Sequence, residues 1–243
     1  MRVEDILKIY NKSTRYAFLH IGKTAGTAVR QSIASQFTPD AVCPYYFHRQ
    51  IESMPDEELE KYGFISAHIG YDLAKSLSDN VFTVLRNPFD RVVSLYYYWR
   101  SVEGDRGGPV IAKESRNFEE FLEVKKAPVI VDIFNAQTWQ LAHGHEGYTR
   151  KKLRGAYTED QLLQKAKENL EQLSVVGVQD NLGLFLQRIN QKFGWNVNEI
   201  LESNRNKERP KIDDVPVRTK RKIYDLVYLD LELYFFAQKL ADY

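Results

Sequence analysis

Short hydrophobic runs alternate along the chain with longer stretches in which hydrophobic positions recur at helical spacing. The short runs are rich in β-branched and aromatic residues, and glycine, asparagine, serine or a charged residue bounds each of them. They are Tyr16–Ile21, Phe64–Ile69, Val81–Leu85 and Val175–Val178. Because helical stretches separate them, the pattern predicts an α/β fold with a mostly parallel sheet and helices on both faces.

After about Phe118 the pattern predicts a mainly helical second half. Two other segments lack clear periodicity: Val102–Arg116, whose glycines and proline predict a mobile loop, and the polar, basic Ser203–Pro216. Irregular stretches of this length are often lids or binding loops. We find no repeat and no linker, so we expect residues 1–243 to form a single domain. The expected helices are Asn117–Lys125, Val131–His143, Glu159–Leu173, Asn181–Phe193 and Val217–Leu240.

Composition narrows the possible partners. The 34 basic and 33 acidic residues leave a net charge of +1, which argues against a protein that coats nucleic acid but permits a compact basic pocket. The single cysteine, Cys43, excludes an intrachain disulfide and a cysteine-based zinc cluster. Hydrophobic runs are far shorter than the ~20 residues of a membrane span, and Met1–Ile6 does not resemble a signal peptide. We expect a cytoplasmic protein without nucleic-acid or membrane partners.

The strongest local motif runs from a predicted strand into a predicted helix. It reads Phe18-Leu-His-Ile-Gly-Lys-Thr-Ala-Gly-Thr27. Small residues allow successive backbone N–H groups to point into one concavity, and the helix N-terminus adds partial positive charge. Phosphate or sulfate is therefore the expected ligand. Lys23 supplies a full charge, and Thr24 and Thr27 supply hydroxyl groups. The alternative is an ordinary strand–turn–helix connection with an incidental lysine.

This motif departs from the nucleotide-hydrolysing P-loop, G-x-x-x-x-G-K-[ST]. Gly22-Lys23-Thr24 fits the end of that pattern, but Ala17 stands where the first glycine belongs. A P-loop kinase or NTPase that uses ATP and Mg²⁺ is therefore the weaker interpretation, though it stays open.

A second strand-to-helix junction follows Val81–Leu85. Asn87 is a good helix cap and Pro88 suits the first helical position. Arg86 leaves the carboxyl end of the strand, which is the edge where open α/β sheets bind ligands. Ser94 lies two turns into the helix on the face of Asn87, so an arginine fork and a hydroxyl can hold a second phosphate. Taken alone, the motif fits a surface arginine and a solvent-facing serine at least as well.

In order, the two motifs resemble the paired signatures of the sulfotransferase family that includes heparan sulfate 2-O-sulfotransferase and bacterial relatives (sulfotransferase family 2). Those signatures read approximately H-I-P-K-T-A-G-T-S and L-R-[DN]-P-x-x-R-x-x-S-x-Y. Here Gly22 stands for the usual proline and Ala28 for a frequent serine. Val175–Gln179 and Asp230–Ala237 resemble a later strand and the C-terminal helix of the family, so the likeness covers most of the chain.

The resemblance implies a P-loop-NTPase-like fold and transfer of the sulfuryl group of 3′-phosphoadenylyl sulfate (PAPS) to a hydroxyl. The product nucleotide would be adenosine 3′,5′-bisphosphate (PAP), and no metal is implied. Arg86 and Ser94 would hold the 3′-phosphate, and a loop carrying Asn204, Arg205 and Lys207 would close over the nucleotide. The residues implied to hold the 5′-phosphosulfate are Gly22, Lys23, Thr24, Ala25, Gly26 and Thr27.

Sulfuryl transfer needs a base for the acceptor proton, and imidazole suits that task because its ordinary pKa is near neutrality. Phe64-Ile-Ser-Ala-His68-Ile-Gly70 places His68 at the carboxyl end of a predicted strand, where the resembling family has its general base. Lys23 would also stabilise negative charge on the departing phosphate oxygen. The other histidines are assigned lesser roles: His48 is an alternative base, His20 is packed in a strand, and His143 and His145 are expected at the surface.

The two motifs predict only the residues that bind the sulfuryl donor, so they do not identify the acceptor. Tyr96–Trp99 forms an aromatic cluster of which part is expected to line a cleft, and Arg150–Arg154 either attracts an anionic acceptor or is a solvated face. Polysaccharide, small metabolite and tyrosyl peptide are all compatible acceptors. A non-catalytic nucleotide- or polyanion-binding module is a further alternative, in which His68 would be dispensable.

Overall fold

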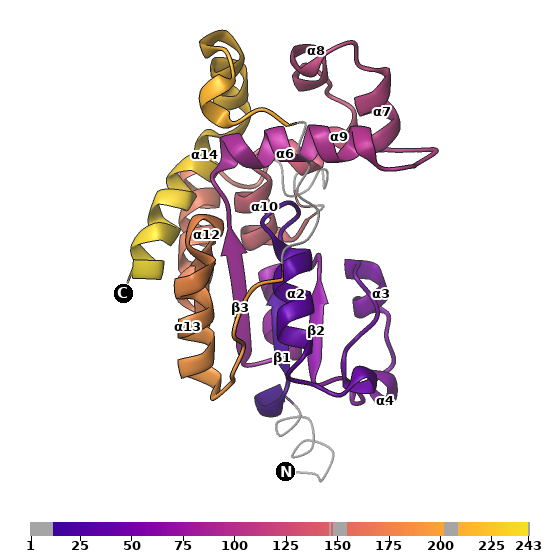
Figure 1. The fold of residues 1–243 in the computed structure, drawn as a ribbon, viewed down its shortest axis with the longest axis vertical. Helices are drawn as coiled ribbons and strands as arrows, with labels where there is room; N and C mark the ends of the chain where they lie inside the picture. Colours follow the sequence, from indigo (N-terminus) through magenta and orange to yellow (C-terminus); the bar gives the residue numbers. More distant parts are fainter. Residues whose placement is uncertain (1–11, 146, 148–154, 202–208, 243) are drawn as a thin grey trace.

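The computed structural model describes residues 12–145, 147, 155–201 and 209–242 (Figure 1). Within these residues, four parallel strands form one sheet in the order β2–β1–β3–β4. Almost every strand residue is buried, as is typical of parallel strands that helices cover on both faces. The predicted α/β fold with a parallel sheet is confirmed. The strands are β1 (Tyr16–Leu19), β2 (Phe64–Ala67), β3 (Asn80–Leu85) and β4 (Val175–Val178).

Alternate strand residues pack into two separate cores. Phe18, Phe64 and Phe82 point to one face, where the ring centroids of Phe18 and Phe82 lie 5.4 Å apart. The helices α2 (Gly26–Ala34) and α13 (Leu182–Phe193) cover this face, and α2 lies in front of the sheet in Figure 1. The opposite face is covered by α5 (Tyr71–Leu77), α10 (Ala136–His143), α12 (Glu159–Glu171) and the later part of α14 (Val217–Asp242).

A third core lies beyond the carboxyl ends of the strands, at the top of Figure 1, and consists of helices. It is built from α6 (Pro88–Ser101), α7 (Gly108–Glu114), α8 (Phe118–Leu122), α9 (Ala127–Ile133) and the first part of α14. No helix in the described part of the chain is long and apolar enough to cross a membrane. The short elements are η1 (Pro39–Ala41), α3 (His48–Glu52), α4 (Asp56–Leu59), η3 (Gln179–Asn181) and η4 (Ile212–Asp214).

The prediction of a loop over Val102–Arg116 is wrong in part, because α7 forms inside it. Pro109 stands at the start of this helix, where its missing N–H costs nothing. Gly108 marks a close approach rather than flexibility, since a Cβ atom there would lie 2.5 Å from the indole of Trp99. Gly108, one of the glycines that suggested a loop, therefore allows α7 to pack against α6.

The single helix predicted over Val131–His143 is also wrong, because the chain breaks it into α9 and α10. Asn135 stands at the break with φ of 43°, a left-handed conformation that asparagine tolerates better than most residues. Its Oδ1 accepts hydrogen bonds from the N–H groups of Leu229 and Asp230, and its own N–H donates to the carbonyl of Leu226. These α14 groups need outside partners because α14 is kinked at Val227, where φ is −134°. The two breaks thus stabilise each other.

Gly177 of β4 gives a direct test of packing between the sheet and α13. A Cβ atom there would collide with the ring of Phe185, including its Cβ and Cγ, which cannot move freely. We expect Gly177→Ala to lower the free energy of unfolding by about 1–3 kcal/mol, as overpacked cores do. Gly183 of α13 has open space around it, so Gly183→Ala is expected to be neutral or slightly stabilising. Urea unfolding of both variants measures the difference, and equal stability would contradict this packing.

Candidate active site

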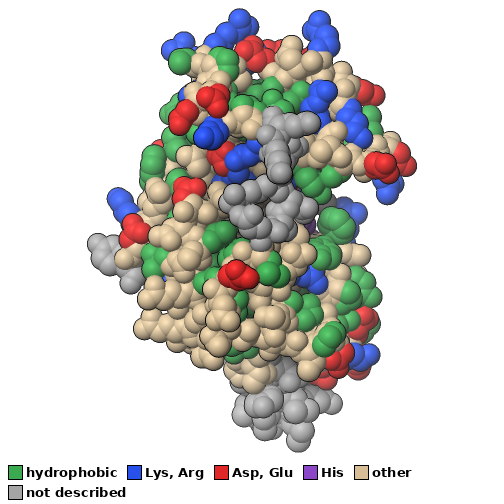
Figure 2. Space-filling view, in the orientation of Figure 1, with side chains coloured by type: hydrophobic (Ala, Val, Ile, Leu, Met, Phe, Trp, Pro, Cys, Tyr) green, Lys and Arg blue, Asp and Glu red, His purple; other side chains and the backbone are tan. Residues whose placement is uncertain are grey.

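A cavity of about 1840 Å³ opens at the carboxyl edge of the sheet. Figure 2 shows the surface hollowed between the arm made by α6 and α7 and, below it, α3. Parallel strands direct the loops that follow them to this edge, so motifs far apart in the sequence meet here. The lining includes Gly22, Lys23, Ala25, Gly26, Thr27, His68, Arg86, Ser94 and Arg209.

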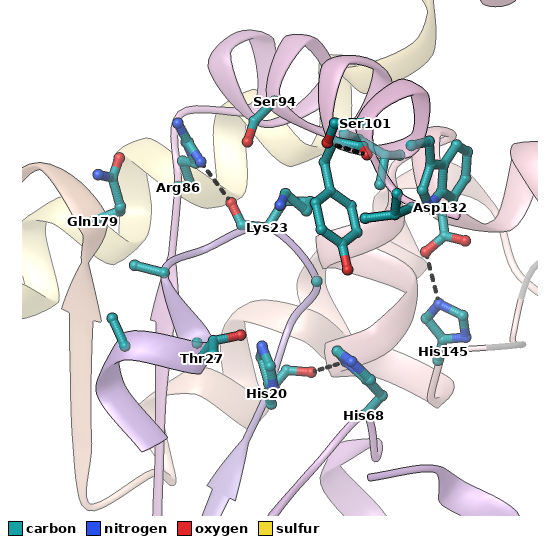
Figure 3. Close-up of a pocket in the computed structure, with 18 of the residues that line it drawn as sticks. His20, Lys23, Thr27, His68, Arg86, Ser94, Ser101, Asp132, His145 and Gln179 are labelled. Atoms are coloured by element: carbon teal, nitrogen blue, oxygen red, sulfur yellow. Dashed lines mark hydrogen bonds and ion pairs between the residues drawn. The ribbon is translucent and has the colours of Figure 1, made fainter. Parts of the chain in front are cut away.

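The loop after β1 has the backbone of an anion site. Lys23 and Ala25 have φ of 68° and 67°, and α2 begins at the next residue, Gly26. Left-handed residues alternating with ordinary ones form the concave backbone shape that holds anions, and a helix N-terminus adds positive potential. The Thr24 hydroxyl is buried and donates to the Ile21 carbonyl at 2.9 Å, so it shapes the loop, whereas Thr27 faces the cavity (Figure 3).

Lys23 is a cation in an unfavourable environment. Its Nζ lies 3.7 Å from the centroid of the Tyr98 ring, which attracts a cation through its negative face. Burial, and after it the positive charges of Arg86, Arg91 and Arg209, lower the pKa of Lys23 to about 8. An anion bound at this loop would relieve that repulsion.

Arg86 follows β3 and belongs to a buried ion cluster. Its guanidinium donates to the Asp90 carboxylate at 2.5 and 2.8 Å and to the Lys23 carbonyl at 2.9 Å (Figure 3). Arg209 donates to the same carboxylate at 2.6 Å. Burial opposes ionisation of Asp90, but hydrogen bonds from Arg209 and Arg86 hold its pKa below the usual range. Ser94, one helical turn after Asp90 on α6, also lines the cavity.

His68 lies directly after β2 with its ring in the cavity wall. Its Nδ1 is 2.9 Å from the carbonyl oxygen of His20 (Figure 3). Because a carbonyl oxygen only accepts, Nδ1 carries the hydrogen and the acceptor lone pair is on Nε2. Burial lowers the pKa of His68, and the nearby positive charge of His145 acts in the same direction. Burial thus favours the neutral imidazole of His68, on which Nε2 is the acceptor atom.

Backbone groups around this edge are held by amide side chains of α10. Gln140 Nε2 donates to the carbonyls of His20 and Ile69 at 2.9 and 3.0 Å. Gln137 accepts from the Arg86 N–H and donates to the Arg86 carbonyl. One helix thus fixes the chain just past the ends of three strands.

Three of the other histidines, His20, His48 and His145, line the cavity. His20 is buried and stacks on Phe18, with its ring centroid 5.5 Å away, as predicted for a packed residue, and its ring centroid lies 4.3 Å from that of His68. His48 lines the cavity from α3, and its Nε2 lies 3.5 Å from Glu52. The expectation that His145 is at the surface is wrong, because it lines the cavity and its Nε2 lies 2.9 Å from the Asp132 carboxylate.

Sequence patterns missed Arg209, Asp132 and His145 as cavity residues. Arg209 lies within the basic stretch Ser203–Pro216, which was predicted to be a lid or binding loop, whereas Asp132 and His145 belong to no motif. Asn204, Arg205 and Lys207, together with Arg150–Arg154, lie outside the described residues. Among the described residues, no group of three histidine, cysteine or acidic side chains is placed to hold a metal ion.

Comparison with known proteins places the chain in a family. The pattern that defines the sulfotransferase family matches residues 9–237. The crystal structure of mouse sulfotransferase SULT7A1 complexed with PAP aligns with 98% of this chain and 92% of its own, at 14% sequence identity and a TM-score of 0.47. No curated protein matches. The family pattern covers nearly the whole chain and both anion-binding motifs, and this protein therefore belongs to the sulfotransferase family.

Proposed function

We propose that this enzyme transfers the sulfuryl group of PAPS to a hydroxyl of a carbohydrate or another small acceptor, without a metal ion. One observation carries the proposal: a neutral imidazole, His68, lines the same cavity as the Lys23 loop. The proposed base for the acceptor, His68, and the proposed cationic site for the donor, the Lys23 loop, thus line the same cavity. Membership of the sulfotransferase family supports PAPS as the donor.

The cationic residues of the cavity suit the donor's charge. The Lys23 loop would hold the 5′-phosphosulfate through backbone N–H groups of residues 22–27, with the Thr27 hydroxyl and the Lys23 ammonium. Arg86 and Ser94 would hold the 3′-phosphate, and Arg209 places a second guanidinium beside Arg86 through their shared partner Asp90. We keep Asn204, Arg205 and Lys207 as proposed nucleotide contacts.

The chemistry is an in-line displacement at sulfur. The acceptor oxygen forms a bond to sulfur while the bond from sulfur to the bridging phosphate oxygen breaks. His68 Nε2 takes the acceptor proton, and its Nδ1–H stays on the His20 carbonyl, which keeps the ring oriented. Lys23 stabilises the negative charge that develops on the leaving phosphate, in a buried setting where such a charge interaction is strong. PAP and the sulfate ester are the products.

Ligand binding separates this proposal from a P-loop kinase or NTPase. We expect PAP to raise the melting temperature of the protein, while ATP with Mg²⁺ does not, because the proposed site has separate positions for the 3′-phosphate and the 5′-phosphate. Ser94→Ala is expected to weaken PAP binding about tenfold, the cost of one hydrogen bond to a charged group. The matched control is Ser76→Ala on α5, whose hydroxyl donates to the Leu73 carbonyl and which is not among the described residues lining the cavity. Stabilisation by ATP with Mg²⁺ alone would favour a kinase or NTPase.

Turnover separates an enzyme from a binding module. With ³⁵S-labelled PAPS and a panel of sugars, phenols and alcohols, we expect labelled product from the wild type. His68→Ala is expected to lower kcat by about 10²–10⁴ and to leave PAP affinity unchanged, since His68 acts on the acceptor. Near-normal turnover in that variant would remove His68 from the mechanism.

The pH dependence of kcat/KM tests both assigned groups. His68 must be unprotonated, so activity rises with pH through its pKa, which burial moves below 6.5. Lys23 must be protonated, so activity falls as pH rises through its pKa of about 8. Lys23→Arg is expected to remove the alkaline limb, because a guanidinium does not titrate in this range. An acid limb that survives unchanged in His68→Ala would argue for another base, such as His48.

A further inference from the structure

Besides His20, a further imidazole, that of His145, lies near His68 in the cavity wall. The ring centroids of His145 and His68 lie 6.3 Å apart, and both side chains line the cavity together with Asp132 (Figure 3). His145 follows the end of α10, whereas Asp132 lies on α9. Neither residue belongs to the phosphate-binding motifs, and the nucleotide site accounts for neither of them.

Close backbone packing brings His145 to this position. Gly70, two residues after His68, packs against Gly144, directly before His145. A Cβ atom on Gly70 would lie 2.5 Å from the Gly144 Cα. Two segments meet at this distance only where a side chain is missing, so the glycines set the separation of the two imidazoles.

Asp132 is anchored as firmly as the histidine it contacts. Arg91 is fully buried, and its guanidinium donates to the carbonyls of Asp132 and Gly22, each at 2.8 Å. Arg91 therefore links the Asp132 backbone to the Lys23 loop, and one side chain positions both of these cavity segments.

The Asp132 carboxylate sets the orientation of His145. Burial opposes ionisation of Asp132, but the hydrogen bond from His145 and the charges of His145 and Arg91 hold its pKa below the usual range. An ionised carboxylate only accepts, so the Nε2 of His145 carries a hydrogen in this 2.9 Å contact. The ring is thereby fixed in place beside the proposed base.

We propose that His145, positioned by Asp132, is a second acceptor-binding residue that contacts a polar group next to the hydroxyl attacked by His68. The inference rests on the proposed function. Two imidazoles this close reach neighbouring atoms of one acceptor, so the site favours an acceptor with two adjacent hydroxyl groups over one with a single hydroxyl. Phe47 lines the same part of the cavity, is 64% exposed and has its ring centroid 6.3 Å from that of His68, so it offers an apolar surface to the rest of the acceptor.

Matched probes test this two-point contact. Cyclohexanol is compared with cis-1,2-cyclohexanediol, and phenol with catechol, using ³⁵S-labelled PAPS. We expect kcat/KM to be about tenfold higher for the diol of each pair, which corresponds to one additional hydrogen bond. This ratio is well above the twofold statistical factor that two equivalent hydroxyl groups would give. His145→Ala is expected to abolish the preference through the KM of the diol, and Asp132→Asn to reduce it. PAP affinity should be unchanged in both variants.

The control is His143→Ala, which removes an imidazole that lies at a tilt against the Tyr157 ring and is not among the described residues lining the cavity. It should keep the diol preference. Equal rates for diol and mono-alcohol in the wild type, or a preference that survives in His145→Ala, would overturn the inference while PAP binding and turnover left the proposed function intact. Failure of PAP binding and of all transfer would overturn both.

The acid limb of the kcat/KM profile, which follows the pKa of His68, gives a second test. It would not shift if His145 and Asp132 had only a structural role. Burial is the largest influence on the pKa of His68, and the groups around it are the carbonyl and ring of His20, His145, Asp132 and Arg91. Asp132 raises the pKa of His68 and His145 lowers it. We therefore expect Asp132→Asn to move the acid limb to lower pH and His145→Ala to move it to higher pH. Shifts in the same direction would contradict the arrangement.

Discussion

The active-site edge depends on hydrogen bonds from two buried glutamines to backbone that has run past the end of the sheet. Beyond β1, β2 and β3 the chain leaves the ladder, and its polar groups need other partners because burial without them is costly. Gln140 satisfies the carbonyls of His20 and Ile69, and Gln137 satisfies both backbone groups of Arg86. The His20 carbonyl in turn orients the His68 ring, so a structural contact sets a chemical property.

The helix that carries these glutamines is itself placed by the C-terminal helix. The buried carboxylate of Asp230 accepts the N–H groups of Gln137 and Thr138 and the Thr138 hydroxyl, which caps α10 at its positive end. Asn135 joins the break before α10 to the kink in α14. Residues near the C-terminus thus hold the loops that follow the first three strands.

Charge pairing explains how a nearly neutral protein carries a strongly cationic cavity. Arg86 and Arg209 share Asp90, while Arg91 lies close to Asp132 and Asp230, so each of these three arginines has a carboxylate nearby. Lys23 is the exception in this cluster, since its contact is the ring of Tyr98 and its pKa is lowered to about 8. The net charge of +1 permitted a compact basic pocket, and only the local arrangement shows where positive charge concentrates.

Features encoded within a few consecutive residues could be predicted from the sequence. The four strands, the Lys23 loop and the Asn87 cap of α6 all follow from local pattern, and Arg86 and His68 line the cavity because parallel strands end at one edge. The break at Asn135, the close approach of Gly70 to Gly144 and the pairing of His145 with Asp132 could not be predicted in this way. Each depends on groups brought together from different elements, and only the packed tertiary structure decides which of them meet.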